Sequence, residues 1–187
     1  MSSTPTPRKI KVATVSLAGC FGCHMSFLDM DLDLFEVLPH VEILRSPFTD
    51  HKSFDCRVDV GLIEGGVCND ENLHVLREFR KNCEILVAVG ECAIMGGLPA
   101  LRNDVPLDEC LTESYITGPT VSNPTNVIPH HRHLPKILDR VYPCHEIVKI
   151  DVFLPGCPPP GPLFRELLKS QIYGHPFSLK PGAITYE

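Results

Sequence analysis

Two kinds of hydrophobic pattern alternate along the chain. Five short apolar runs, rich in β-branched side chains, are typical of β-strands and lie at residues 10–17, 41–44, 58–63, 85–89 and 150–154. Between them, apolar residues recur at helical spacing, which predicts helices at residues 25–38, 70–81, 134–141 and 163–172. Strands that alternate with helices predict an α/β fold, a doubly wound parallel sheet with helices on both faces.

The same pattern suggests how the chain is organised. Residues 1–9 are polar, contain two prolines and are expected to be a flexible N-terminal segment. Residues 10–187 are expected to form a single α/β domain, since 187 residues fit one domain comfortably. Residues 102–129 hold four prolines and little periodicity, which predicts a long surface connection of the kind that contacts partners.

Composition and charge narrow the class of protein. Hydrophobic residues make up 43% of the chain, enough for a real core, and the formal net charge is −6, so no basic footprint for nucleic acid exists. No apolar run approaches the ~20 residues of a membrane span, and the start lacks the apolar core of a secretory signal. We therefore expect a cytoplasmic protein with no nucleic-acid partner and no membrane span.

Four of the nine cysteines follow predicted strands. Cys20 and Cys23 come after the first strand, Cys92 follows the run at 85–89, and Cys157 follows the run at 150–154. The carboxyl ends of parallel strands line one edge of a sheet, where ligands bind. Four convergent thiolates suit a 4Fe–4S cluster or a tetrahedral zinc ion, so a metal site is expected at this edge.

Other uses of the cysteines are weaker. Cys20 and Cys23 alone could form a thioredoxin-like redox pair, but this would leave Cys92 and Cys157 unexplained. A structural zinc site usually takes two close CxxC pairs, and only one is present. The remaining cysteines are expected to be buried packing residues, with Cys68 an improbable ligand; they are Cys56, Cys68, Cys83, Cys110 and Cys144.

Four ordered motifs carry a resemblance to a known family. They are Cys20-Phe-Gly-Cys23, Glu64-Gly-Gly66, Gly90-Glu-Cys-Ala93 and Pro155-Gly-Cys-Pro-Pro159. Together they resemble the small subunit of NiFe hydrogenases, which shares its cluster domain with a subunit of respiratory complex I. Many such subunits carry Glu where this chain has Met25. They also carry a twin-arginine leader and a long carboxyl-terminal extension, which are not expected here. The short chain is most similar to the small subunit of NAD-reducing (bidirectional) hydrogenases.

The resemblance implies a function. Cys20, Cys23, Cys92 and Cys157 would hold one 4Fe–4S cluster in a flavodoxin-like domain, with the NiFe centre on a large partner subunit. The cluster would relay electrons to a diaphorase module of iron–sulfur and flavin subunits that reduces NAD+. The complex I subunit is disfavoured because it carries tandem cysteines in the first loop. A coenzyme F420- or ferredoxin-linked hydrogenase and, from another class, a zinc-stabilised binding module remain as alternatives.

Several features stay open at this level. His24 could bond to cluster sulfur, line a proton path or face a partner. Glu64 could relay protons, cap a helix or form an interchain salt bridge. The tract His130–His133 is expected to be a solvated or partner-facing loop. Bound FMN is conceivable in this fold, although GxGxxG and GxxxxGK[ST] are absent. The apolar residues beside the cysteines predict a contact surface; they are Phe21, Met25, Ile94, Met95 and Pro158–Pro160.

Overall fold

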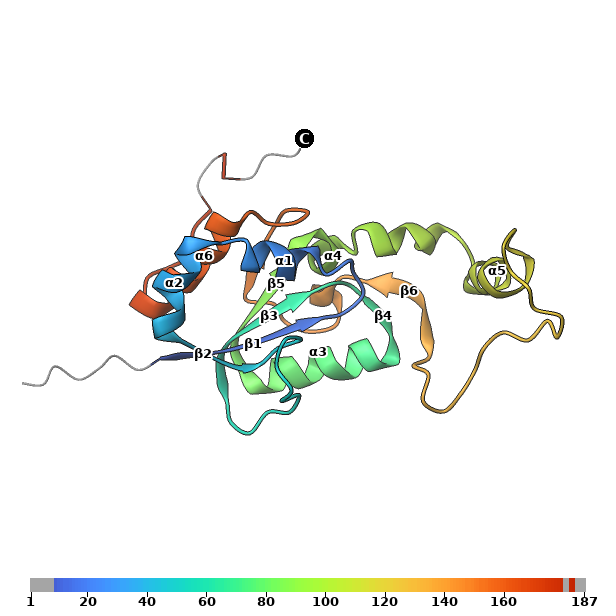
Figure 1. Ribbon diagram of the computed structural model, residues 1–187, viewed down its shortest axis with the longest axis horizontal. Coiled ribbons are helices and arrows are strands. Elements are labelled where there is room, and N and C mark those ends of the chain that lie inside the picture. Colours follow the sequence, from blue (N-terminus) through green and yellow to red (C-terminus); the bar gives the residue numbers. More distant parts are fainter. Residues whose placement is uncertain (1–8, 180–181, 184–187) are drawn as a thin grey trace, which may run out of the picture.

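A five-stranded parallel sheet forms the centre of the protein (Figure 1). The computed structural model describes residues 9–179 and 182–183, so most of the predicted flexible segment lies outside the described residues. The strands, in their order across the sheet, are β2 (Val41–Arg45), β1 (Ile10–Ser16), β3 (Val58–Glu64), β5 (Cys83–Val89) and β7 (Val152–Leu154). This is the flavodoxin-like order, which confirms the predicted fold class.

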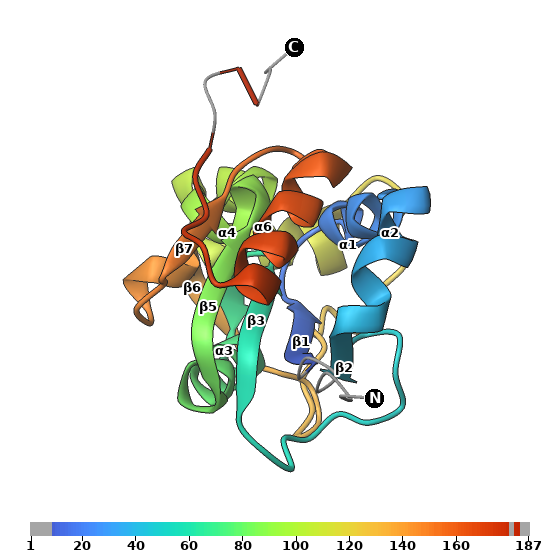
Figure 2. The ribbon, with the colours of Figure 1, turned by 90° about the vertical axis from the view of Figure 1, so that its left-hand side faces the viewer.

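Helices cover both faces of the sheet. The α-helices are α1 (Gly22–Leu28), α2 (Leu32–Val37), α3 (Asp70–Asn82), α4 (Gly90–Met95), α5 (Leu107–Thr112) and α6 (Gly161–Tyr173). Short 3-10 helices span Leu38–His40, Leu98–Asp104 and Cys144–Glu146, and a π-helical turn spans Glu113–Thr117. Figure 2 shows α1, α2 and α6 together on one side of the strands, with α3 on the other.

The alternation of side chains along the strands divides the core in two. On one face, Val12, Leu62 and Val87 pack with side chains of α1, α2 and α6. On the other face, Ile63 and Ala88 pack with α3 and α4. Since successive residues of a strand point to opposite faces, a strand that is apolar throughout must be covered on both sides. The continuous apolar runs of the sequence therefore match the three-layer arrangement.

The predicted helix at residues 25–38 is broken into α1 and α2. Asp31, in the turn between them, has a φ of 53°, a backbone conformation that ends a right-handed helix. The apolar stripe that suggested one helix is not the buried face: Phe27, Met30 and Val37 are buried. The stripe itself is between 38% and 74% exposed and consists of Met25, Leu28, Leu32 and Phe35.

The predicted helix at residues 134–141 is wrong. The structure has a strand there, β6 (Ile137–Tyr142), which pairs antiparallel with β4 (Val67–Asn69) in a separate two-stranded sheet. Pro135 disfavours the helical conformation in the residue before it, and the segment is rich in β-branched and aromatic side chains. β6 is difficult to predict from the sequence because its partner strand, β4, has only three residues.

The long connection is more ordered than expected. Residues 102–129 include the end of the 3-10 helix Leu98–Asp104, all of α5 and the turn Glu113–Thr117, and only the remainder is irregular. In Figure 1 this part of the chain extends to one side of the sheet before it returns to β6. Within the described residues, no helix has the length and apolar character needed to cross a membrane.

Candidate metal centre

The carboxyl ends of four strands stand in register. Across the sheet Ser16 pairs with Glu64, Glu64 with Val89, and Val89 with Leu154. Each of these four residues ends its strand, so the loops that follow β1, β5 and β7 leave the sheet at one level. These loops carry Cys20 and Cys23, Cys92, and Cys157. The register therefore brings the predicted ligand loops to the same edge.

Helix α1, which carries Cys23, is capped from a neighbouring strand. Phe21, the residue before the helix, has a φ of 68° and offers no side-chain cap. The Glu64 carboxylate, at the end of β3, instead accepts the N–H groups of Cys23 and His24, each at 3.1 Å. Backbone N–H groups in the first turn of a helix have no partner within it, and a carboxylate there also suits the helix dipole. Glu64 is therefore a helix cap that fixes the Cys23 loop.

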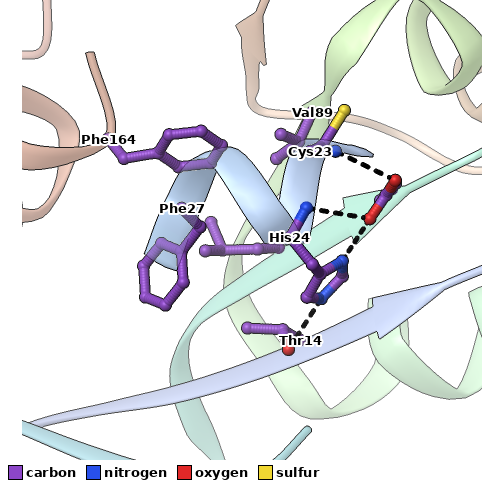
Figure 3. Close-up of a pocket in the computed structure, with 8 residues that line it drawn as sticks. Thr14, Cys23, His24, Phe27, Val89 and Phe164 are labelled. Carbon is purple, nitrogen blue, oxygen red and sulfur yellow. Dashed lines mark hydrogen bonds and ion pairs between the residues drawn. The ribbon is translucent and has the colours of Figure 1, made fainter. Parts of the chain in front are cut away.

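His24 is buried between two polar side chains (Figure 3). Its Nδ1 is paired with the Glu64 carboxylate, and its Nε2 lies 3.0 Å from the Thr14 hydroxyl oxygen. The ring also stacks on Phe21 at a centroid distance of 4.7 Å. His24 is 5% exposed and Glu64 is 2% exposed, so neither faces a partner. The sequence analysis did not single out Thr14, although a polar threonine within a predicted buried strand could have indicated it.

The loop that follows β5 lies against the loop that follows β1. Gly90 has a φ of +79°, and a Cβ built on it would lie 2.4 Å from the Cys23 Sγ, so the sulfur rests against the bare glycine backbone. Gly97, with a φ of +50°, also approaches a cysteine closely, since its Cβ would lie 2.9 Å from the Cys92 sulfur. Only glycine adopts such conformations freely and leaves the required space. These two glycines bring Cys23 and Cys92 to one place.

The third loop is linked to both others. The Glu91 N–H donates to the Gly156 carbonyl at 3.2 Å, and the Gly156 N–H donates to the Glu91 carboxylate at 2.9 Å. The Ser26 hydroxyl, in α1, donates to the Pro159 carbonyl at 2.6 Å. The sequence analysis singled out neither residue as functional, although Glu91 lies inside one of the four motifs and Ser26 lies three residues after another.

The pKa values of Cys23 and Cys92 are raised by burial and by the thiols around them. Burial raises the pKa of Cys23, and the charges of Glu64, Cys92, Cys20 and Cys157 raise it further. Burial likewise raises the pKa of Cys92, opposed by the Leu98 backbone N–H and reinforced by Cys157, Cys20 and Glu64. The structure thus brings together all four predicted ligand residues. Thiols whose pKa values are raised together become thiolates only beside a positive group, which is what a metal centre provides.

The edge also limits which groups fit. A tetrahedral zinc ion with Zn–S bonds of 2.3 Å needs sulfurs about 3.8 Å apart. Among residues 9–179 and 182–183, no three Cys, His, Asp or Glu side chains are arranged to hold a single metal ion. The cavity between His24, Glu64 and Phe164, between β1 and β3, measures about 10 Å³. A sulfur-ligated cluster outside this cavity suits the donor set.

The thiols differ in exposure. Cys20 and Cys157 are exposed, whereas Cys23 and Cys92 are half-buried, so the group of thiols is open on one side. Apolar side chains flank the open side: Met25 is 51% exposed and Met95 is 62% exposed. Of the residues expected to form a contact surface, Pro158 and Pro160 are also exposed, whereas Phe21 and Ile94 are half-buried. The expectation is wrong for Pro159, which is buried.

The other five cysteines do not all match the prediction of buried packing. Cys83 and Cys144 are buried, and burial raises the pKa of each thiol to about 12. Cys56, in contrast, is exposed with its sulfur 3.2 Å from the Lys11 Nζ, and Cys68 and Cys110 are half-buried. Packing therefore explains two of the five, and the prediction is wrong for Cys56.

The histidine tract lies on the surface, as expected. All four residues from 130 to 133 are exposed. The rings of His131 and His133 lie 5.1 Å apart, and His130 and His131 border a groove of about 520 Å³ between the tract and α5. The tract is remote in sequence from the ligand loops and belongs to the segment that extends beside the sheet.

Sequence comparison assigns the class of protein. The profile of the family described as NADH ubiquinone oxidoreductase, 20 Kd subunit, matches residues 20–170, a span that contains all four cysteines predicted as ligands. The chain belongs to this family, and within it the resemblance to small subunits of NAD-reducing NiFe hydrogenases is confirmed.

Individual relatives make the assignment more specific. The NAD-reducing hydrogenase HoxS subunit delta of Cupriavidus necator is 47% identical over 180 residues, which cover 96% of this chain and 86% of that protein. A crystal structure of NAD+-reducing [NiFe]-hydrogenase in the H2-reduced state contains a chain that matches with a TM-score of 0.91 and 45% identity; the match covers 96% of this chain and all of that one.

A more distant relative belongs to another hydrogenase type. One of the subunits of the F420-non-reducing hydrogenase of Methanothermobacter marburgensis is 36% identical over 173 residues. The match covers 91% of this chain but 56% of that protein, so this chain spans about half its length.

Proposed function

We propose that this chain is the electron-transfer small subunit of an NAD-reducing NiFe hydrogenase and holds one 4Fe–4S cluster through Cys20, Cys23, Cys92 and Cys157. One observation carries the proposal: three loops at aligned strand ends gather four cysteines, and the other three thiols contribute to raising the pKa of Cys23. A cluster of this kind takes up and releases one electron at a time. The chain's own residues fix where that exchange occurs.

Each part of the site has a task in this proposal. Glu64 caps α1 and so fixes the direction of the Cys23 thiolate. The packed side of the edge, with His24 and Phe27, keeps water from the cluster, because these side chains are buried. The exposed thiols Cys20 and Cys157 mark the side through which electrons enter or leave.

The open side requires partners. A large subunit carrying the NiFe centre would cover the apolar residues beside Cys20 and Cys157. The iron–sulfur and flavin subunits of a diaphorase module would receive the electrons, giving H2 + NAD+ = NADH + H+. The exposed stripe of Met25, Leu28 and Phe35 supports an obligate partnership, because a patch of this kind marks a contact surface. We assign the complex to the cytoplasm.

The relatives support NAD+ as the acceptor. The relative named as NAD-reducing is 47% identical to this chain, against 29% for the coenzyme F420 hydrogenase subunit gamma of Methanosarcina barkeri. NAD+ is therefore favoured over a coenzyme F420- or ferredoxin-linked acceptor. A hydrogen-dependent reduction assay with each acceptor, carried out on the assembled complex, tests this choice, and faster reduction of another acceptor would overturn it.

Anaerobic purification tests the cluster. We expect about four iron atoms and about four sulfides per chain, with the EPR signal of a reduced 4Fe–4S cluster. A colourless protein that holds stoichiometric zinc would show instead a zinc-stabilised binding module.

The partnership is tested by expressing this chain alone and together with a hydrogenase large subunit. We expect the cluster to survive only in the second case, and a stable cluster-containing monomer that does not bind the large subunit would contradict the partnership.

A further inference from the structure

The loop that carries Cys157 depends on contacts outside its own strand. It follows β7, which has three residues and lies at the edge of the sheet, where β5 is its only partner strand among the described residues. The loops after β1 and β5 instead follow seven-residue strands with neighbours on both sides. The position of Cys157 is therefore the least constrained of the four by the sheet itself.

Two side chains outside the proposed ligand set supply additional contacts to the loop that carries Cys157. We propose that Glu91 and Ser26 are positioning residues that hold the Cys157 loop against the other two ligand loops. This inference rests on the proposed cluster and goes beyond it, because it assigns to these residues the geometry and retention of the fourth ligand.

Glu91 ties the second loop to the third in both directions. Its N–H donates to the Gly156 carbonyl at 3.2 Å, and its carboxylate accepts the Gly156 N–H at 2.9 Å. Gly156 directly precedes Cys157 and has a φ of +131°, a conformation that side-chain-bearing residues rarely adopt. A hydrogen bond to a charged acceptor is stronger than a neutral one. The carboxylate therefore holds the backbone at the position where it turns toward the cysteine.

Ser26 ties the first loop to the third. It lies in α1, three residues after Cys23, and its hydroxyl donates to the Pro159 carbonyl at 2.6 Å. Both Ser26 and Pro159 are buried, so the bond does not compete with water. Gly161, two residues after Pro159, packs against Asp29 and Met30 in the turn after α1. Ser26 and Glu91 thus fix the third loop on both sides of Cys157.

The effect expected from this arrangement is specific to one ligand. Without the carboxylate of Glu91, the Gly156 N–H loses its acceptor while the sheet and the other three cysteines keep their contacts. Cys157 should then leave the cluster more readily than in the unaltered protein. Cluster properties should change with little change in folding.

The test uses the full chain, co-produced with a hydrogenase large subunit and purified anaerobically. Glu91→Ala, Glu91→Gln and Ser26→Ala are compared with Glu84→Ala, at the opposite end of β5, and with Ser53→Ala on the surface. The readouts are the rate of iron release to a chelator, the midpoint potential from an EPR-monitored titration, and the thermal unfolding midpoint. We expect Glu91→Ala to release iron about tenfold faster, the scale of one charge-assisted hydrogen bond. Glu91→Gln, which keeps an acceptor oxygen, should restore most of the difference.

Ser26→Ala should speed iron release by a smaller factor, about threefold to fivefold, because the lost bond is neutral. Both control variants should match the unaltered protein. Iron release and potential unchanged in Glu91→Ala and Ser26→Ala would overturn the inference. A lower unfolding midpoint without any change in cluster properties would overturn it as well. An unaltered protein that binds no 4Fe–4S cluster would instead overturn the proposed function, so the two failures are distinguishable.

Discussion

The two ends of the parallel sheet are built in opposite ways. At the amino ends of β5 and β7, polar groups satisfy one another. The Asp151 carboxylate accepts the Leu86 N–H at 2.9 Å and pairs with Arg80, whose guanidinium also donates to the carbonyls of Cys83 and Glu84. At the carboxyl ends the chain leaves the strands through glycines with positive φ, among them Gly65 and Gly90, and presents thiols.

The difference shows where function resides in this fold. The amino end is a closed network that needs no further group, so its residues contribute to stability. The carboxyl end collects thiols whose pKa values are raised by burial and by one another, which leaves them suited to a ligand from outside. Substitutions at the carboxyl end should therefore change the cluster, and substitutions at the amino end should change the free energy of unfolding.

The largest effect is expected from loss of a ligand. Cys157→Ala should lose or degrade the cluster, and hydrogen-driven NAD+ reduction should be lost with it, because four thiolates hold a cluster of this type. Cys110→Ala, in α5, should keep both. Iron and sulfide analysis with EPR measures the result. Retention of the cluster by Cys157→Ala together with its loss in Cys110→Ala would show that the ligands are assigned wrongly.

Alanine substitutions at two glycines distinguish the effect of steric crowding from that of backbone strain. Gly90 and Gly174 both have positive φ, at +79° and +69°, but a Cβ on Gly90 would lie 2.4 Å from the Cys23 sulfur, whereas one on Gly174 would meet nothing within 4 Å. Gly90→Ala should therefore lose most of the cluster, because the sulfur must move. Gly174→Ala should keep it and lower the free energy of unfolding by only about 1 kcal/mol. Equal cluster contents in the two variants would contradict the close approach of the loops.

The sheet, and the gathering of four cysteines at one of its edges, were predictable from the sequence for the same reason. Apolar runs such as 58–63 and 85–89 are buried on both faces, so burial imposes a pattern that a single sequence displays. Cys92 and Cys157 each follow such a run by a few residues, and the topology of parallel strands supplies the rest. Burial also explains why the single helix predicted at residues 25–38 is wrong. The apolar residues there have the spacing of a core-facing helix, but they are exposed.

The contacts between loops were not predictable. The bond between Glu91 and Gly156 joins residues 65 apart, and that between Ser26 and Pro159 joins residues 133 apart. Likewise Glu64 caps a helix that begins 42 residues before it, so no local capping pattern exists at Phe21. Such contacts depend on the register of the strands, which spacing along one chain does not encode. The strand β6 was missed because it, too, is defined by a distant partner.

Beyond the carboxyl end, the largest effect on stability is expected at Phe79. This side chain, near the end of α3, is fully buried, makes an edge contact with Phe54 at 5.0 Å and lies under the Arg45 guanidinium. Phe79→Ala should lower the free energy of unfolding by about 3–5 kcal/mol, since it removes apolar contacts and leaves a cavity. Chemical denaturation of the full chain measures the loss. Any folded fraction should still bind its full share of iron, and a selective loss of the cluster would contradict the division between the two ends.

The smallest effect, and one that depends on pH, is expected at Asp151. Burial alone would raise the pKa of this carboxyl, but the hydrogen bonds from Arg80 and from the Leu86 N–H outweigh it and hold the pKa below its usual value. A group with a lowered pKa stabilises the fold above its unfolded pKa, and this stabilisation is lost as the pH falls through the folded pKa. At pH 7, Asp151→Asn should therefore lower the free energy of unfolding by about 1 kcal/mol, a value reduced by the partial exposure of the pair.

The pH profile distinguishes this charge effect from a loss of packing. The difference between Asp151→Asn and the unaltered protein should shrink as the pH falls below about 4, the usual range of an aspartate pKa, because the unaltered carboxyl then becomes protonated. Denaturation curves recorded from pH 7 downward measure it, with Asp50→Asn on the surface as the control. A difference that stays constant with pH would mean that the amino end of the sheet is held by shape and not by the charge of Asp151.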